Sequence, residues 1–114
     1  MENKLLGRYG EQIAVDFLRG KGYEILDCGY SCPFGEIDII AEKDRCVIFV
    51  EVKTRKHRKE IPAMASVGPL KQRHIINTAG VWVSENDCRL QVRFDIIEIY
   101  AADKVIRHIK NAFA

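Results

Sequence analysis

Two apolar stretches of this sequence carry acidic residues at the positions where strands are usually most hydrophobic. FGEIDII holds Glu36 and Asp38, and CVIFVEVKTR holds Glu51 and Lys53. Side chains alternate along a strand, so we expect Glu36 and Asp38 to share one face of their strand and, likewise, Glu51 and Lys53 to share one face of theirs. If the two strands pair, three carboxylates and one ammonium converge at one end of a hairpin.

Several acids in one place are unfavourable unless a cation lies between them. An unpartnered buried carboxylate normally takes up a proton, and a single lysine does not neutralise three acids. Carboxylate oxygens with water suit Mg²⁺ or Mn²⁺ better than zinc. Such an ion can hold a phosphate oxygen, lower the pKa of a water and stabilise transition-state charge. Lys53 would then orient the water or offset the developing charge.

Each of these residues also has an ordinary explanation. Glu36 could be a solvent-facing residue of a one-sided sheet, and Glu51 with Lys53 could be a surface pair. Because side chains alternate along the strand, Ile37 and Ile39 would lie on the face opposite to Glu36 and Asp38. The two motifs on adjacent strands favour the metal site over these alternatives, because the acids interrupt the most apolar part of each strand.

The remaining segments predict a small mixed sheet with a helix on each side, of the α/β or α+β kind. Apolar residues at 3.6-residue spacing predict helices over 5–21 and from Pro69 to about 84–87. Period-two and continuous apolar runs separated by turn residues predict the strands. These strands begin near Tyr23 and cover 35–42, 46–54, 90–100 and 104–109. We expect the second and third to form an antiparallel hairpin, the fourth to be central and the last to lie at an edge.

Length and composition place the chain among single globular domains, residues 1–114. It is 47% hydrophobic and 30% charged, and no apolar run approaches the roughly 18 residues of a membrane span. Its start lacks a signal-peptide pattern, so we expect a cytoplasmic protein with no membrane association. The cysteines include no CxxC pair and are expected to be free thiols rather than zinc ligands or disulfides.

The basic charge is local. The net charge is only +2, which does not by itself identify a nucleic-acid binder. The run KTRKHRK, at 53–59, follows the second acidic strand directly. Its first two residues end the predicted strand and the rest open a loop, 55–68, in which the sequence AMAS could form a helical turn. Such runs are often solvated loops, and this one could also contact phosphates.

At this point the sequence resembles a known family. FGEIDII followed by VIFVEVKTR is similar to the PD-(D/E)xK nuclease signature, in the form found in the YraN-like family of uncharacterised endonuclease-like proteins. GRYGEQIAVDFLRGKGYEIL, KQRHI and RFDIIEI look like further family blocks. Those proteins resemble archaeal Holliday junction resolvases. The resemblance therefore implies a restriction-endonuclease-like core over the whole domain.

The resemblance also implies roles for individual residues. Asp38 looks like the first metal-binding acid, Glu51 like the acid of the ExK element and Lys53 like its lysine. The backbone carbonyl of Val52 would be a further ligand. Glu11 matches a helix acid that reaches the metal in resolvase-like nucleases, although its pattern alone equally fits a surface glutamate.

Glu36 joins Asp38, Glu51 and Lys53 as a candidate catalytic residue. A second set is expected to bind nucleic acid through phosphates rather than bases. Two members, Lys71 and Gln72, lie near the apolar stripe of the second helix, where Lys71 could also be an ordinary surface lysine. Arg93 and Asp95 are expected to pair and to be structural. The full nucleic-acid-binding set is Arg55, Lys56, Arg58, Lys59, Lys71 and Gln72.

Three functions follow as hypotheses. The first is a nuclease dependent on Mg²⁺ or Mn²⁺ that hydrolyses DNA, in a branched or otherwise structured form. The second is a non-catalytic nucleic-acid-binding or complex-assembly module on the same scaffold. An RNA nuclease ranks lower because the sequence lacks the aromatic signatures of RNA-binding modules. The last strand or the amphipathic helices could support a homodimer.

Overall fold

The computed structural model describes residues 3–56 and 67–114, with side chains from residue 6 onward. The predicted helices and strands are confirmed with slightly different bounds, whereas the predicted helical turn at AMAS lies outside the described residues. In chain order, the elements are α1 (Asn3–Gly20), β1 (Glu24–Cys32), β2 (Gly35–Lys43), β3 (Cys46–Arg55), α3 (Pro69–Glu85), β4 (Gln91–Tyr100) and β5 (Val105–Ile109).

The strands form one mixed sheet in the order β1-β2-β3-β4-β5. β1 pairs with β2, β2 with β3 and β4 with β5 in antiparallel fashion. β3 and β4 are parallel, which requires a long crossover connection, and α3 lies in it. The predicted hairpin and edge strand are confirmed, and β4 has a neighbour on each side.

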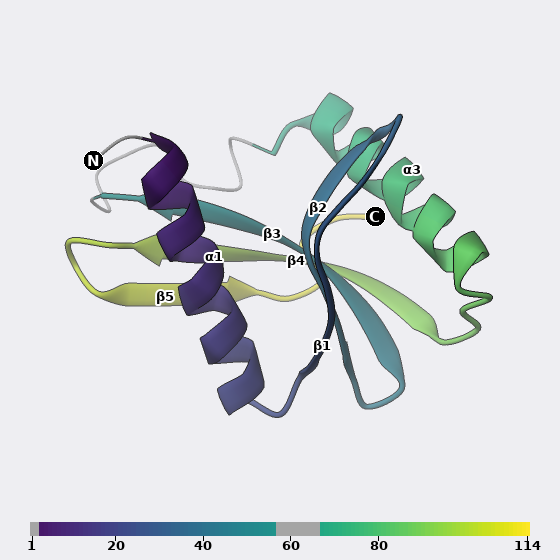
Figure 1. The fold of residues 1–114 in the computed structure, drawn as a ribbon, viewed down its shortest axis with the longest axis horizontal. Coiled ribbons are helices and arrows are strands. Elements are labelled where there is room, and N and C mark those ends of the chain that lie inside the picture. Colours follow the sequence, from purple (N-terminus) through teal and green to yellow (C-terminus); the bar gives the residue numbers. More distant parts are fainter. Residues whose placement is uncertain (1–2, 57–66) are drawn as a thin grey trace.

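The two helices cover opposite faces of the sheet, as Figure 1 shows. Alternation along β3 divides the core accordingly: Val47 and Phe49 pack toward α3, and Ile48 and Val50 pack toward α1. The α3 side is rich in aromatic rings, with Phe49 meeting Trp82 edge-on at 5.8 Å between ring centroids. Extending the alternation places the next odd-numbered residues of β3, which are polar, on the α3 side of the sheet.

Special backbone positions fix the ends and the approach of the helices. Gly22, at φ +91°, follows the end of α1, in the left-handed conformation that suits glycine after a helix. Gly10 lies where α1 meets β3: a Cβ there would stand 1.8 Å from Thr54 Oγ1. Pro69 begins α3 as predicted.

The sequence predicts an apolar stripe on α3 made of Ile75, Ile76, Ala79, Trp82 and Val83, and this is confirmed only in part. Ile75, Ala79 and Trp82 are buried in the core, but Ile76 is 37% exposed. The reason is geometric, because Ile76 follows Ile75 by about 100° around the helix and turns away from the sheet.

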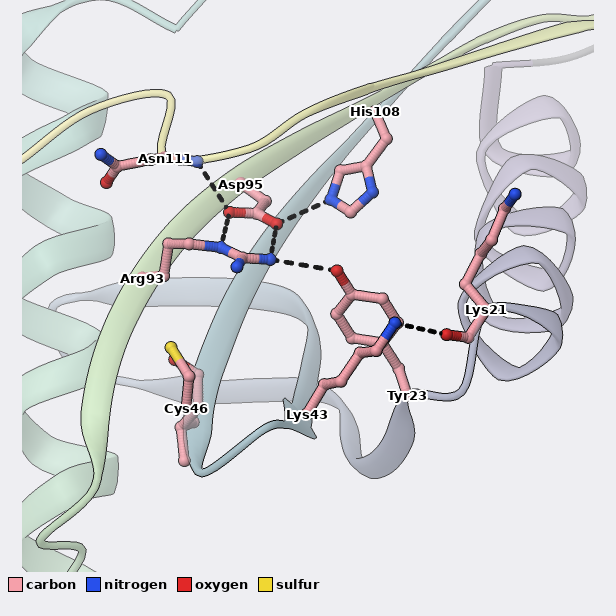
Figure 2. Close-up of polar contacts among 9 residues, drawn as sticks. Lys21, Tyr23, Lys43, Cys46, Arg93, Asp95, His108 and Asn111 are labelled. Atoms are coloured by element: carbon pink, nitrogen blue, oxygen red, sulfur yellow. Dashed lines mark hydrogen bonds and ion pairs between the residues drawn. The ribbon is translucent and has the colours of Figure 1, made fainter.

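A buried acidic residue ties the C-terminal part of the sheet together. Asp95 accepts two hydrogen bonds of 2.8 Å from Arg93 and one of 3.0 Å from the Asn111 N–H, and lies 2.6 Å from His108 Nε2. Figure 2 shows Arg93 also reaching Tyr23 Oη, at 3.1 Å. The predicted Arg93–Asp95 pair is confirmed, and its role is structural because every polar atom of the carboxylate is used inside the fold.

The four cysteines are free, as expected. Across residues 3–56 and 67–114, no helix is both long and apolar enough to span a membrane.

Candidate functional site

The site forms where β2 separates from β3. The paired residues of these strands run from Lys43↔Cys46 up to Ile39↔Val50. At the next position, the side chain of Asp38 replaces the backbone as hydrogen-bond acceptor: its Oδ2 accepts a 2.8 Å hydrogen bond from the Val52 N–H. A carboxylate thus stands in place of the next ladder bond and is fixed against the backbone of β3.

The separation also changes the alternation predicted for β2. Ile37 packs in the α3-side core and Ile39 in the α1-side core, so the prediction that they share a face is wrong. The pairing of β2 with β3 ends at Ile39↔Val50, just before Asp38 is reached, and the tip of the β1–β2 hairpin lies near α3 (Figure 1). This opening leaves room beside the acids.

Glu51 is the centre of the site's ion pairs. Its side chain is 6% exposed, and its Oε2 lies 3.3 Å from Lys53 Nζ and 2.5 Å from Lys71 Nζ. The predicted Glu51–Lys53 pair is therefore present, and a second lysine from the first turn of α3 joins it. A buried carboxylate needs such partners, since leaving one unpaired is strongly unfavourable.

Glu51 and Lys71 border a cavity of about 390 Å³ between the β1–β2 hairpin, β3 and the start of α3. Glu36, which is exposed, reaches the same cavity as Asp38 and Glu51, so the three predicted acids do converge on one space. The lining residues are Gly35, Glu36, Asp38, Glu51, Leu70, Lys71, His74 and Ile75.

The electrostatics reflect acids held close together. Burial raises the pKa of Asp38 to about 8, and the charge of Glu51 adds to the shift, while the hydrogen bond from Val52 opposes it. Burial and then the proximity of the Lys71 ammonium lower the pKa of Lys53, against the attraction of Glu51. For Lys71, burial acts downward, but the hydrogen bond to Glu51 and the charge of that carboxylate raise its pKa overall. A pair of carboxylates with such a shift favours a proton or a metal cation between them.

Glu11 lies on the other side of Asp38. Both border a second cavity, of about 310 Å³, beside α1, and the charge of Glu11 contributes only weakly to the pKa of Asp38. Among the described residues, no three His, Cys, Asp or Glu side chains gather closely enough to hold a metal ion. The structure therefore brings Asp38 and Glu51 together, but it does not bring Glu11 into the same group.

The donor set nevertheless fits a hard divalent cation. Two carboxylates are suitable ligands for Mg²⁺, which keeps several waters in protein sites. The N–H and C=O of one strand residue point to the same side, so the Val52 carbonyl faces the side on which Asp38 receives the Val52 N–H. Val52 therefore has its oxygen on the side of β3 where the resemblance implies a ligand.

The predicted nucleic-acid-binding residues have different positions. Arg55 is half-buried at the end of β3, and its Nε has no hydrogen-bond partner in the part of the chain that the structure describes. Lys56 follows it and is exposed. Gln72 donates a 2.8 Å hydrogen bond to the Val67 carbonyl, which gives it a structural role at the start of α3. Arg58 and Lys59 lie outside the described residues.

Two features of the cavity were not predicted from the sequence. Lys71 was expected near DNA phosphates but not against Glu51, and His74 was not expected in the lining. The spacing of Lys71 and His74, three residues apart in a helix beginning at Pro69, would have placed them on one face. Which face meets β3 depends on tertiary packing, which the spacing does not give.

Comparison with known proteins identifies the family. Residues 10–99 match the model of the uncharacterised protein family UPF0102. The chain is 43% identical over 114 residues to a UPF0102 protein of Clostridioides difficile (strain 630), covering 99% of this chain and 100% of the relative. It is 42% identical over 116 residues to a UPF0102 protein of Geotalea uraniireducens (strain Rf4), covering 98% and 91% respectively. The predicted membership of the YraN-like family is confirmed, and the chain belongs to the uncharacterised protein family UPF0102.

Proposed function

We propose that this protein is a nuclease that uses Mg²⁺ or Mn²⁺ to hydrolyse phosphodiester bonds of DNA. The observation that carries the proposal is the meeting of Asp38 and Glu51 on the wall of an open cavity, with Lys53 Nζ 3.3 Å from Glu51 Oε2. Acids from two strands with an adjoining lysine are the arrangement that the PD-(D/E)xK signature implies.

The topology supports the same proposal. An antiparallel run of β1, β2 and β3, followed by α3 and a parallel β4, with α1 on the opposite face, is compatible with a restriction-endonuclease-like core. A fold by itself does not give an activity, so the argument depends on the residues in the cavity.

Asp38, Glu51 and the Val52 carbonyl would hold the metal ion. When bound, the ion would supply a polarised phosphate oxygen and a water of lowered pKa. Lys53, 19% exposed and held by Glu51, would place a positive charge where the reacting phosphate becomes more negative. Glu36 would border the entering substrate, and Arg55 and Lys56, which continue β3 beyond Lys53, would contact phosphates.

The test is cleavage of fluorescent four-way junction, flap, single-stranded and duplex DNA in Mg²⁺, Mn²⁺ or EDTA. We expect metal-dependent cutting that Asp38→Asn and Lys53→Ala remove. Asp16→Asn, an exposed carboxylate on α1 with Gln12 as its hydrogen-bond partner, is the matched control and should cut as wild type does. Full metal-dependent cleavage by Asp38→Asn would contradict the assigned site.

A second candidate function has an observation of its own. Lys53 and Lys71 already offset the charge of Glu51 from within the chain, so Glu51 is paired without a metal ion. This favours a nucleic-acid-binding or complex-assembly module that has the nuclease scaffold without turnover. Such a module would bind DNA equally well in EDTA and in Mg²⁺ and would tolerate Lys53→Ala.

A further inference from the structure

Lys71 makes the shortest ion pair in the cavity, and it comes from the helix rather than from the acidic strands. Its Nζ lies 2.5 Å from Glu51 Oε2, compared with 3.3 Å for Lys53 on β3. Lys71 sits in the first turn of α3, which contains no acidic residue. A cation is unfavourable at a helix N-terminus unless an anion compensates for it, so Glu51 holds Lys71 at a position where it would otherwise be destabilising.

The charges of the cluster are already balanced once Asp38 has released its proton, which is the state that a metal ion would require. With both carboxylates ionised, Asp38 and Glu51 carry two negative charges, and Lys53 and Lys71 carry two positive ones. Adding a divalent ion to this set would leave a net charge of two in a partly buried space, where unbalanced charge is unfavourable. One lysine must therefore leave Glu51 if a metal ion is to bind there.

The two lysines differ in their freedom to leave. The Lys53 side chain is 19% exposed and lies within the sheet, whereas the Lys71 side chain is 44% exposed at the edge of the cavity. A lysine side chain that stays half in water can turn outward with its stem still packed on the protein. Lys71 is thus the residue that can move.

We propose that Lys71 is an internal substitute for the divalent cation: it occupies Glu51 in the metal-free protein and passes to a DNA phosphate when the metal ion binds. This rests on the proposed function, whose metal site it extends. In the displaced position, Lys71 stands beside the N-terminal N–H groups of α3, which favour a phosphate. Binding of the metal ion therefore favours binding of DNA, and binding of DNA favours binding of the metal ion.

A coupling of this kind is reciprocal. If the metal ion releases Lys71 toward DNA, DNA must tighten the binding of the metal ion by the same factor. An ion pair with one half-exposed partner contributes up to about 1 kcal/mol, so we expect a factor of about 2 to 5. The readout is binding, and it does not require cleavage.

The experiment compares wild type with Lys71→Gln and Lys71→Arg. The electron paramagnetic resonance signal of free Mn²⁺ measures metal affinity without DNA. We expect Lys71→Gln to bind Mn²⁺ about 2 to 5 times more tightly than wild type, because Glu51 is no longer occupied. Lys71→Arg keeps the cation and should stay near wild type. Arg73→Gln, an exposed charge in the same part of α3, controls for loss of a positive charge near the cavity and should also stay near wild type.

Fluorescence anisotropy with a four-way junction in EDTA and in Ca²⁺ measures DNA affinity without and with a divalent ion. A gel checks that the DNA stays intact. Lys71→Gln should change DNA affinity little in EDTA, where Lys71 is held by Glu51, and weaken it about 2 to 5 times in Ca²⁺.

Two results would overturn the inference, and they can be told apart. Equal Mn²⁺ affinity in wild type and Lys71→Gln, with metal bound by both, would show that Lys71 does not compete, while leaving the metal site intact. Absence of Mn²⁺ binding by every variant, with and without DNA, would overturn the proposed metal-dependent function and the inference with it.

Discussion

Replacing Gly10 by alanine tests how closely α1 must approach the sheet. A Cβ at this position would lie 1.8 Å from Thr54 Oγ1, whereas at Gly7, one turn earlier, it would meet nothing within 4 Å. Ordinary contact begins at about 3.4 Å, so α1 and β3 would have to separate by about 1.6 Å at Gly10. Overpacking of this kind typically costs about 1–3 kcal/mol.

Both substitutions also gain helix propensity, by about 0.5–1 kcal/mol. We therefore expect Gly7→Ala to stabilise the protein by that amount and Gly10→Ala to be about 1–3 kcal/mol less stable than Gly7→Ala. Urea unfolding followed by the fluorescence of Trp82, the only tryptophan, measures the free energy of unfolding of each variant. Equal stability of Gly7→Ala and Gly10→Ala would refute the close approach.

A second substitution locates the overlap. Thr54→Ala removes Oγ1 and Cγ2 but leaves the Thr54 Cβ, which would stand 3.0 Å from the new methyl group. Combined with Gly10→Ala in a double variant, Thr54→Ala should recover part of the stability that Gly10→Ala removes. Thr54→Val puts a methyl group where Oγ1 was and should recover none. A double-mutant cycle isolates this coupling from the effect that each change at Thr54 has by itself.

Three further predictions follow from charged groups. In EDTA, the free energy of unfolding should fall as pH rises from about 4 to 8. Folded Asp38 keeps its proton over this range, whereas the unfolded chain, with the ordinary pKa of 3.8, has released it. Urea titrations of wild type and Asp38→Asn check this, and the same dependence on pH in the variant would contradict it. Although burial acts upward, hydrogen bonds from His108 and Arg93 lower the pKa of Asp95. Asp95 therefore adds to the free energy of unfolding above its ordinary pKa of 3.8, and this stabilisation is lost as pH falls through the lower folded value. Acid unfolding of Asp95→Asn should not show this loss of stability. Arg55→Gln with Lys56→Gln should reduce the salt slope of DNA binding by about 2, and anisotropy at several salt concentrations showing the wild-type slope would remove these residues from the interface.

Patterns local in the sequence predicted most of the fold and the centre of the site. The acids of FGEIDII and VEVK could be placed together because a short connection between two apolar runs implies a hairpin, and the hairpin brings Asp38 to Val52. The boundaries of α3 followed from Pro69 and from the end of its apolar stripe. In these regions, the interactions that fix the structure lie close together along the chain.

Contacts between distant segments could not be predicted. Lys71 reaches Glu51 because the crossover helix packs its first turn against β3, and Gln72 is held by Val67 rather than facing DNA. Periodicity gives the faces of a helix but not its rotation or translation on a sheet. The same holds for Tyr23, whose hydroxyl accepts from Arg93 70 residues away.

The carboxylate that replaces a ladder bond gives the site a built-in spectroscopic probe. The Val52 N–H is bonded to Asp38 Oδ2 and not to a backbone carbonyl, so its proton resonance and its exchange with deuterium depend on the charge and position of one side chain. An amide hydrogen bond to a charged acceptor is stronger than one to a neutral acceptor. A single backbone signal can therefore report protonation, metal binding or substrate entry at the cavity, even when no reaction takes place.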